Sequence, residues 1–294
     1  MLARANAAKQ ANTQRSIAGQ SRWTGCESRP KLQSVALAPE PDLMHPILLH
    51  IGTLPIQGYA VFVALAALVA FRIRRSELAR LGWQADPRQR RLALAALVGA
   101  VLGSKLGVAL FPALGDPRAF WLRMLDIDFT GKTVVGALAG GFVAVEIAKR
   151  RLGIRHRTGD AWAVALPAGQ GIGRLGCLLH GCCAGVPSAV PWAVTISGIT
   201  RHPAPLYESV LDFALAAVLW SIRKQPRPLG HLFRFYLIGY ATIRLSLDGL
   251  RVDSQPALGP LSWVQLGCLL AMAGFGVQLL RERGQNLCPT PNAP

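Results

Sequence analysis

Charged residues are scarce in this sequence. They make up 16% of its 294 residues, and 51% of the residues are hydrophobic. An ordinary soluble domain has about 25% charged residues. The mean hydropathy of +0.33 points the same way. We therefore predict an integral membrane protein.

Acidic residues are fewer still, since 15 Asp and Glu stand against 32 Lys and Arg. A nucleic-acid-binding surface would need its basic residues on one folded face, interleaved with stacking aromatics. Here the basic residues sit at the ends of apolar stretches instead, and we expect no nucleic-acid partner.

Residues 1–43 lack an apolar core long enough for a signal peptide, although they are rich in Ala, Gln and Ser. Met44 opens a segment that reads like a natural start. We predict that 1–43 is either a disordered extension or a mis-assigned start, that 44–284 is one membrane domain, and that 285–294 is a tail.

Seven apolar stretches follow Met44, with short connections between them. They cover about 56–71, 92–111, 133–148, 161–180, 206–222, 232–247 and 258–280. Some are shorter than the roughly 20 residues that an untilted span needs. We predict an all-α protein whose seven or so transmembrane helices form one bundle.

Basic residues are divided unevenly between the two sets of connections. The turns after the first, third, fifth and seventh stretches hold 17 Lys and Arg, and the opposite loops hold five. Because basic loops stay in the cytoplasm, the amino terminus is predicted outside and the carboxyl terminus in the cytoplasm.

Three cations interrupt the apolar stretches: Arg174, Arg244 and Lys105. A charge at the centre of a span costs about 2.5–3.5 kcal/mol, so it is usually kept to bind something inside the bundle. For Lys105, extension of the side chain to the headgroups is an equally good explanation. Glycines beside Arg174, including Gly173, favour a binding role for this arginine.

Acidic and phenolic groups accompany these cations. Glu208 opens the fifth stretch, and Tyr240, Arg244 and Asp248 recur at steps of four in the sixth, which places them on one helical face. They can form a structural salt bridge. Together with Arg174, we interpret them as an anion site with its supporting groups.

The six cysteines do not form the disulfide framework of a small secreted domain. Cys177, Cys182 and Cys183 cluster with His180 in GRLGCLLHGCCAG. Their spacing is not that of a zinc site, and we predict no metal and no cofactor. A disulfide from Cys177 to Cys182 or Cys183 is an alternative on an oxidising face.

At these residues the chain resembles the prolipoprotein diacylglyceryl transferases of bacterial cytoplasmic membranes, from Met44 to about Arg283. The resemblance is carried by LPIQGYAV with Tyr59, GSKLG at 103–107, GRLG with Arg174, Gly185, RHPAPLYE ending at Glu208, and LIGYATIR with Arg244.

This resemblance implies a multi-pass inner-membrane enzyme that moves the diacylglyceryl group of phosphatidylglycerol, a membrane lipid, to the cysteine thiol of exported preprolipoproteins. It implies catalytic roles for Arg174, Arg244, Tyr59 and Glu208. Substrate-binding roles are expected for Gly173, Gly185, Tyr240, Asp248, Lys105, Cys177 and Cys182.

Three features depart from the family pattern. Val135-Gly136-Ala137 stands where the family has His-Gly-Gly, Cys177 and Cys182 replace an asparagine and a glutamate, and the segment between Gly181 and Arg201 is short. Alternatives are therefore a paralogue with another acceptor, a membrane thiol-redox protein, or a lipid-binding or transport protein without turnover.

Overall fold

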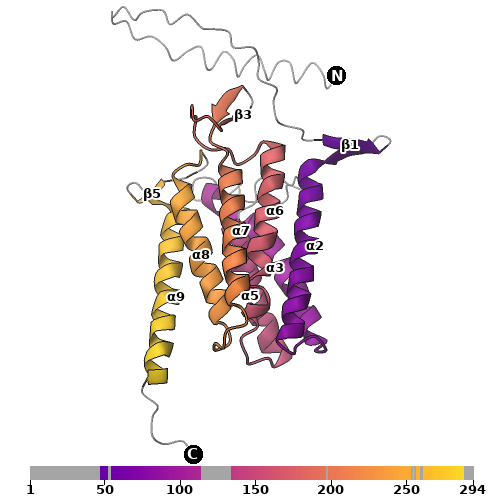
Figure 1. The fold of residues 1–294 in the computed structure, drawn as a ribbon, viewed down its shortest axis with the longest axis vertical. Helices are drawn as coiled ribbons and strands as arrows, with labels where there is room; N and C mark the ends of the chain where they lie inside the picture. Colours follow the sequence, from indigo (N-terminus) through magenta and orange to yellow (C-terminus); the bar gives the residue numbers. More distant parts are fainter. Residues whose placement is uncertain are drawn as a thin grey trace, which may run out of the picture. The chain divides into compact units, whose positions relative to one another are not determined.

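The computed structural model describes residues 47–51, 54–113, 134–196, 198–252, 254, 256–258 and 261–287. The predicted extension 1–43 and the basic residues Arg118, Arg123 and Lys132 lie outside this part. Within it, the long elements are α2 (Gly58–Arg80), α3 (Arg88–Ala113), α5 (Val134–Leu152), α6 (Ala165–His180), α7 (Ala204–Ile222), α8 (His231–Asp248) and α9 (Trp263–Leu287) (Figure 1).

Each of the seven predicted apolar stretches coincides with one of these helices, and α6 is preceded by a 3-10 turn, η1 (Gly159–Ala161). The mostly helical prediction is therefore confirmed for the described residues. Three short antiparallel ribbons were not predicted: β1 (Ile47–Ile51) with β2 (Leu54–Gln57), β3 (Val194–Ile196) with β4 (Ile199–Arg201), and β5 (Pro256–Leu258) with β6 (Leu261–Ser262).

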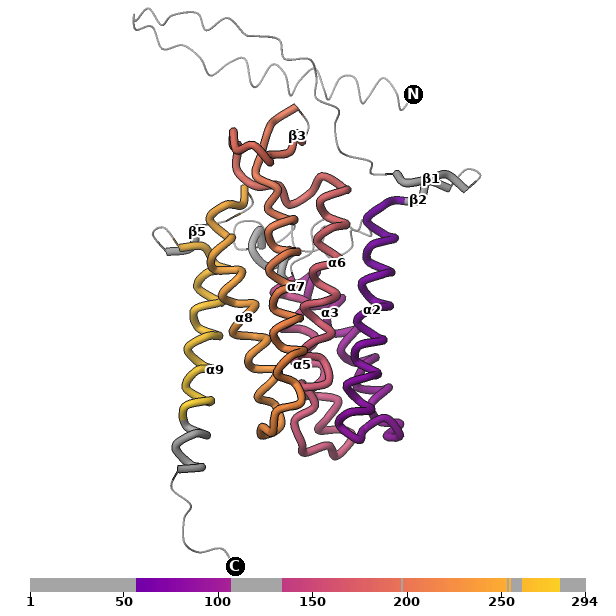
Figure 2. The backbone as a smooth tube through the Cα atoms, viewed as in Figure 1, coloured from indigo at the N-terminus to yellow at the C-terminus, as the bar shows by residue number. Residues whose placement is uncertain are grey.

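The helices pack in a regular succession. α6 lies between α2 and α7, α8 packs against α7, and α9 packs against α8 (Figure 2). The helices α3 and α5 form the closest pair. Tyr236 and Tyr240 of α8 are almost fully buried with Val164 and Leu219 in the core cluster.

Glycines allow α3 and α5 to pack closely. A Cβ atom on Gly103 would lie 2.3 Å from the carbonyl oxygen of Gly136, and one on Gly140 would lie 2.3 Å from that of Gly99. The backbones therefore touch where larger residues would hold them apart. The described glycines of α5 thus have a packing role.

Much of the outer surface of the bundle is apolar. Leu94, Leu97, Leu270 and Leu280 are each more than 60% exposed, although they are large hydrophobic side chains. Soluble monomers rarely expose broad apolar patches. In the described residues, α7 and Trp263–Leu280 of α9 are long and apolar enough to cross a membrane. The count of seven spans stays a prediction.

The basic turns gather at one end of the bundle and are held there by buried polar groups. Glu77 of α2 is fully buried and pairs with Arg80 at 2.8 Å and with Arg223, just after α7, at 2.7 Å. The Asp160 carboxylate accepts backbone hydrogen bonds from Gly230 and Phe233 at the start of α8, at 2.6 and 2.9 Å. Such contacts cap the helix and fix its position.

Replacing Gly140 with alanine tests the close contact of α3 and α5. Alanine favours a helix over glycine by about 1 kcal/mol, but overpacking costs about 1–3 kcal/mol, so we expect Gly140→Ala to lower the melting temperature in detergent. Gly274→Ala in α9 is the matched control, because no neighbour lies within 4 Å of its Cβ position. Equal or higher stability in both variants would contradict the glycine interface.

Candidate functional site

A buried carboxylate at the end of the bundle opposite the basic turns carries the candidate site. Glu208 of α7 is 1% exposed, and its Oε1 atom accepts a hydrogen bond from Arg174 of α6 at 2.7 Å. The same oxygen accepts a bond from Arg244 of α8 at 3.4 Å. Three helices therefore meet at one side chain, and the structure brings together the predicted residues Arg174, Glu208 and Arg244.

A third arginine completes this network. Arg251, in the segment after α8, lies 3.5 Å from Oε2 of Glu208. The sequence prediction missed it, because Arg251 was counted among the loop cations. Its position three residues beyond Asp248, where the helix that carries Arg244 ends, is the sequence signal that could have identified it.

Asp248 is the second carboxylate that pairs with Arg244, in addition to Glu208. The Asp248 carboxylate is 2% exposed and pairs with Arg244 at 3.2 Å. Its second oxygen accepts hydrogen bonds from the hydroxyls of Ser254, at 2.7 Å, and Ser262, at 2.5 Å. The alternative of a structural salt bridge along one face of α8 is thus observed, whereas the anion site stays a prediction. Ser262 of the ribbon β5–β6 adds its hydroxyl to the pair.

Glycines in α6 set the position of Arg174. A Cβ atom on Gly176 would lie 2.8 Å from Phe62 of α2, and one on Gly171 would lie 2.9 Å from Phe213 of α7. The hydroxyl of Ser209 donates to the Gly171 carbonyl at 2.8 Å and ties α7 to α6. At Gly173 no atom lies within 4 Å of a Cβ position. Space is therefore left at Gly173 itself, where a binding role was expected.

Gly185 connects the segment that follows α6 to the segment that precedes α7. Its N–H donates to the His202 carbonyl at 3.0 Å, and Arg201 donates to its carbonyl at 3.4 Å. A Cβ atom here would lie 2.6 Å from that of His202. The structure thus gives Gly185 a packing position in which a side chain would not fit.

The remaining predicted residues lie in three places. Tyr59, at the start of α2, is half-buried with its ring 5.8 Å from that of His180. Tyr240 is buried in the core, on the same face of α8 as Arg244. Lys105 is half-buried on α3, whereas the network is built from α6, α7, α8 and Arg251. Val135, at the position of the missing histidine, is 36% exposed.

Four buried polar atoms near the network have no hydrogen-bond partner in the described part of the chain. They are both carboxylate oxygens of Asp212, the hydroxyl of Tyr240 and Nε of Arg244. Asp212 is fully buried on α7, one helical turn beyond Glu208. Sequence reasoning passed over it, although its spacing of four from Glu208 was a visible signal.

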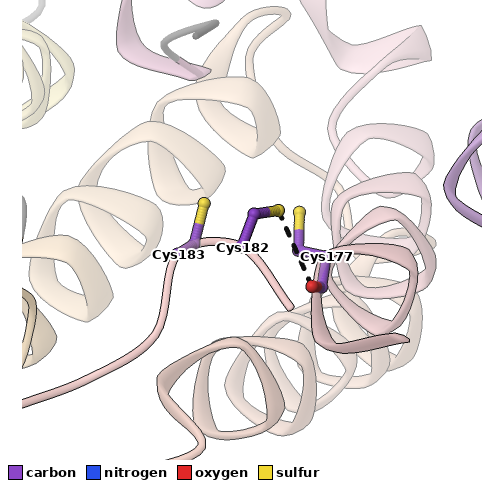
Figure 3. A group of neighbouring side chains, drawn as sticks. All are labelled: Cys177, Cys182 and Cys183. Carbon is purple, nitrogen blue, oxygen red and sulfur yellow. Dashed lines mark hydrogen bonds between the residues drawn. The ribbon is translucent and has the colours of Figure 1, made fainter. Parts of the chain in front are cut away.

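The end of α6 brings three thiols together. Gly181 has a left-handed backbone with φ of 75°, and the N–H of Cys182 donates to the Cys177 carbonyl at 3.1 Å. This is a Schellman cap, which folds the chain back over the last helical turn. The three sulfur atoms of Cys177, Cys182 and Cys183 then lie within 4.8 Å of one another (Figure 3).

The three cysteines are free thiols, so the structure contains no disulfide among them. Hydrogen bonds from Cys177 and Cys182 hold the pKa of Cys183 well below its ordinary value, and Arg251 and Arg174 strengthen the effect. The same shared bonds raise the pKa of Cys182. One sulfur of the group is thus stabilised as a thiolate by the other two.

Removing the charge of Glu208 tests whether it neutralises the arginines. Breaking a buried pair typically costs about 3–5 kcal/mol, so Glu208→Gln should lower the unfolding free energy strongly in a denaturant titration. Glu146→Gln is the control, because Glu146 is 39% exposed where it pairs with Lys149 at 2.8 Å. It should cost less than about 1 kcal/mol, and similar losses in both variants would contradict a central role for Glu208.

Comparison with known proteins identifies a family and several relatives. A family profile described as prolipoprotein diacylglyceryl transferase matches residues 46–280. The chain is 32% identical over 254 residues to a protein of Chromohalobacter salexigens, covering 83% of this chain and 94% of that one. It is 30% identical over 250 residues to a protein of Nitratidesulfovibrio vulgaris, covering 81% and 94%.

A protein of Bordetella avium is 32% identical over 220 residues, which cover 70% of this chain and 81% of that one. All three relatives are named phosphatidylglycerol–prolipoprotein diacylglyceryl transferase. The matched region begins just after Met44 and contains the whole arginine–glutamate network.

Proposed function

The chain belongs to the prolipoprotein diacylglyceryl transferase family, and from this premise we propose that it transfers the diacylglyceryl group of phosphatidylglycerol to the cysteine thiol of exported preprolipoproteins. The observation that carries the proposal is the convergence of Arg174, Arg244 and Arg251 on Glu208. A phosphate ester is the group that such an arrangement binds best.

The network offers more donors than its carboxylates accept. Each guanidinium has five N–H groups, and the buried Nε atom of Arg244 is without a partner in the described residues. A lipid phosphate can accept hydrogen bonds from these N–H groups. Glu208 then stays in place and keeps the guanidinium groups oriented. The open side of Gly173 gives the phosphate room beside Arg174.

The reaction separates charge at this phosphate. The acceptor thiol loses its proton, and the thiolate attacks the glyceryl carbon that bears the phosphate oxygen. The carbon–oxygen bond breaks, and glycerol phosphate leaves with the electron pair. Arg174 and Arg244 hold the charge that develops on the leaving group. Tyr59 and Tyr240 are proposed to position the headgroup.

The site also fits a lipid substrate by its place in the bundle. It lies between α6, α7 and α8, where exposed apolar side chains such as Val210 cover the outer face of α7. Phosphatidylglycerol can then enter sideways from the bilayer with its headgroup near Glu208. We propose an inner-membrane location with seven spans, and a thiol-redox or non-catalytic role is less well supported by the family match.

Substitution of Arg174 tests the phosphate clamp. Lysine keeps the charge but not the planar pair of donors, so Arg174→Lys should reduce transfer about 100-fold or more. The assay follows label from phosphatidylglycerol to a lipobox peptide, with purified protein. Arg150→Lys, at an exposed position of the basic end, is the control and should leave transfer unchanged. Near-normal transfer by both variants would make Arg174 a purely structural residue.

The proposed orientation places the site on the outer side of the membrane. A reporter fused after Arg283 should read cytoplasmic, and one inserted in the loop 188–193 should read external. The expectation rests on the basic turns, which the fold gathers at the opposite end from Glu208. The reverse pair of readings would place the site on the wrong side for exported acceptors.

A further inference from the structure

The three thiols at the end of α6 form a cluster that the transfer reaction does not use. Cys177 is buried, Cys182 and Cys183 are half-buried, and the three sulfur atoms lie within 4.8 Å of one another (Figure 3). Their closeness follows from the local backbone. The Schellman cap at Gly181 brings Cys182 over Cys177, and Cys183 has a left-handed φ of 60° that is unusual for a residue with a side chain.

We propose that Cys177, Cys182 and Cys183 bind one soft metal ion as three thiolate ligands, and that the ion is Cu(I). Soft thiolates select monovalent copper, and three sulfurs suit a planar three-coordinate ion. A metal–sulfur distance of about 2.3 Å places the sulfurs of such a site about 4 Å apart. Small side-chain rotations bring the cluster to that spacing.

Zinc fits the cluster less well, because structural zinc takes four ligands and the described residues bring three metal-ligating groups together here. His180 is not a member of the group, although its buried Nδ1 is without a partner in the described residues. A disulfide needs two of the sulfurs and leaves the third unexplained.

The charged groups around the cluster also favour a monovalent cation. Three thiolates around one monovalent ion leave two negative charges, and the guanidinium groups of Arg251 and Arg174 lie close enough to interact with Cys183. Binding releases the thiol protons to solvent and changes no oxidation state. Because Cys177 is one turn from Arg174, the ion would sit beside the phosphate site.

The test uses the full chain, purified in detergent, reduced and kept without oxygen. Cu(I) is titrated against a chromophoric Cu(I) chelator, and thiolate-to-copper charge transfer is followed in the near ultraviolet. We expect one equivalent to bind tightly, and Cys177→Ser, Cys182→Ser and Cys183→Ser each to weaken binding about 100-fold or more. Cys268→Ser, which removes a lone buried thiol of α9, should bind like the wild type.

A second measurement requires no variant. Maleimide labelling and peptide mapping of the wild-type chain should show these three thiols, and not Cys268, protected by one equivalent of Cu(I). Equal labelling with and without copper, binding that survives the serine substitutions, or a disulfide among the three in the isolated protein would overturn the proposal. None of these readouts depends on transferase activity.

A separate observation concerns Asp212. This carboxylate is fully buried, and neither oxygen has a hydrogen-bond partner in the described residues. An isolated buried carboxylate is costly unless something pairs with it. Glu208 already faces three arginines, and Asp248 faces Arg244 and two hydroxyls. Of these three carboxylates, Asp212 is thus the one whose two oxygens both lack a partner in the described residues.

The geometry points to Asp212 as the proton acceptor for the acceptor thiol, an inference that rests on the proposed function. The S–H proton passes to an Asp212 oxygen, directly or through one water, while the sulfur attacks the glyceryl carbon and the phosphate leaves with the bond's electrons. Asp212 then releases the proton to water. The charged or titratable groups that interact with it electrostatically are Glu208, Arg174, Arg244, Tyr236 and Tyr240.

Asp212→Asn keeps the shape and removes the proton acceptor. At neutral pH we expect turnover to fall about 100-fold, with the KM for phosphatidylglycerol within about twofold of the wild type. The deficit should shrink as pH rises toward about 8.5, where the thiol ionises without help. Asp212→Glu should recover part of the activity.

A merely structural role would give no rescue by pH. Turnover of Asp212→Asn within about threefold of the wild type, or a loss that is the same at every pH, would overturn the assignment. If the wild type itself transfers nothing, the proposed function fails instead, so the two failures are distinguishable.

Discussion

One buried carboxylate organises the candidate site. Glu208 receives guanidinium groups from α6, from α8 and from the segment that follows α8. Removed from water, these charges are tolerable only while they neutralise one another. The same ion pairs also fix α6 and α8 relative to α7, because Arg174 and Arg244 reach Glu208 only when these helices are packed together. The stability of the bundle and the proposed anion binding thus both depend on the side chain of Glu208.

The buried charged groups at the two ends of the bundle differ in their partners. At the basic end, Glu77 and Asp160 each accept bonds from two partners and hold turns in place. At the other end, Asp212, Tyr240 and Arg244 keep buried polar atoms without partners in the described residues. Buried atoms of Arg74, Gln89 and His156 at the basic end also lack partners in the described residues. Those of Asp212, Tyr240 and Arg244 adjoin the arginine–glutamate network, and we infer that a ligand's own polar atoms belong beside them.

Sequence patterns predicted the helices well, because long apolar stretches leave few alternatives to a helix in a membrane. They also identified Arg174, Glu208 and Arg244, since charges stand out in apolar surroundings. Arg251 was missed because a cation in a loop is common in any sequence. Asp212 was missed because only the fold shows that it is buried near Glu208. The closeness of Cys177 to Cys182 depends on the left-handed turn at Gly181, which ligand spacing alone does not reveal.

In a living membrane, the arginine–glutamate network is proposed to perform diacylglyceryl transfer. The most direct test is to express the full chain in a bacterium depleted of its own diacylglyceryl transferase. We expect growth to recover and mass spectrometry to find diacylglyceryl on the lipobox cysteine of newly made lipoproteins. Unmodified lipoproteins and no growth, with the chain present in the membrane at normal levels, would contradict the account.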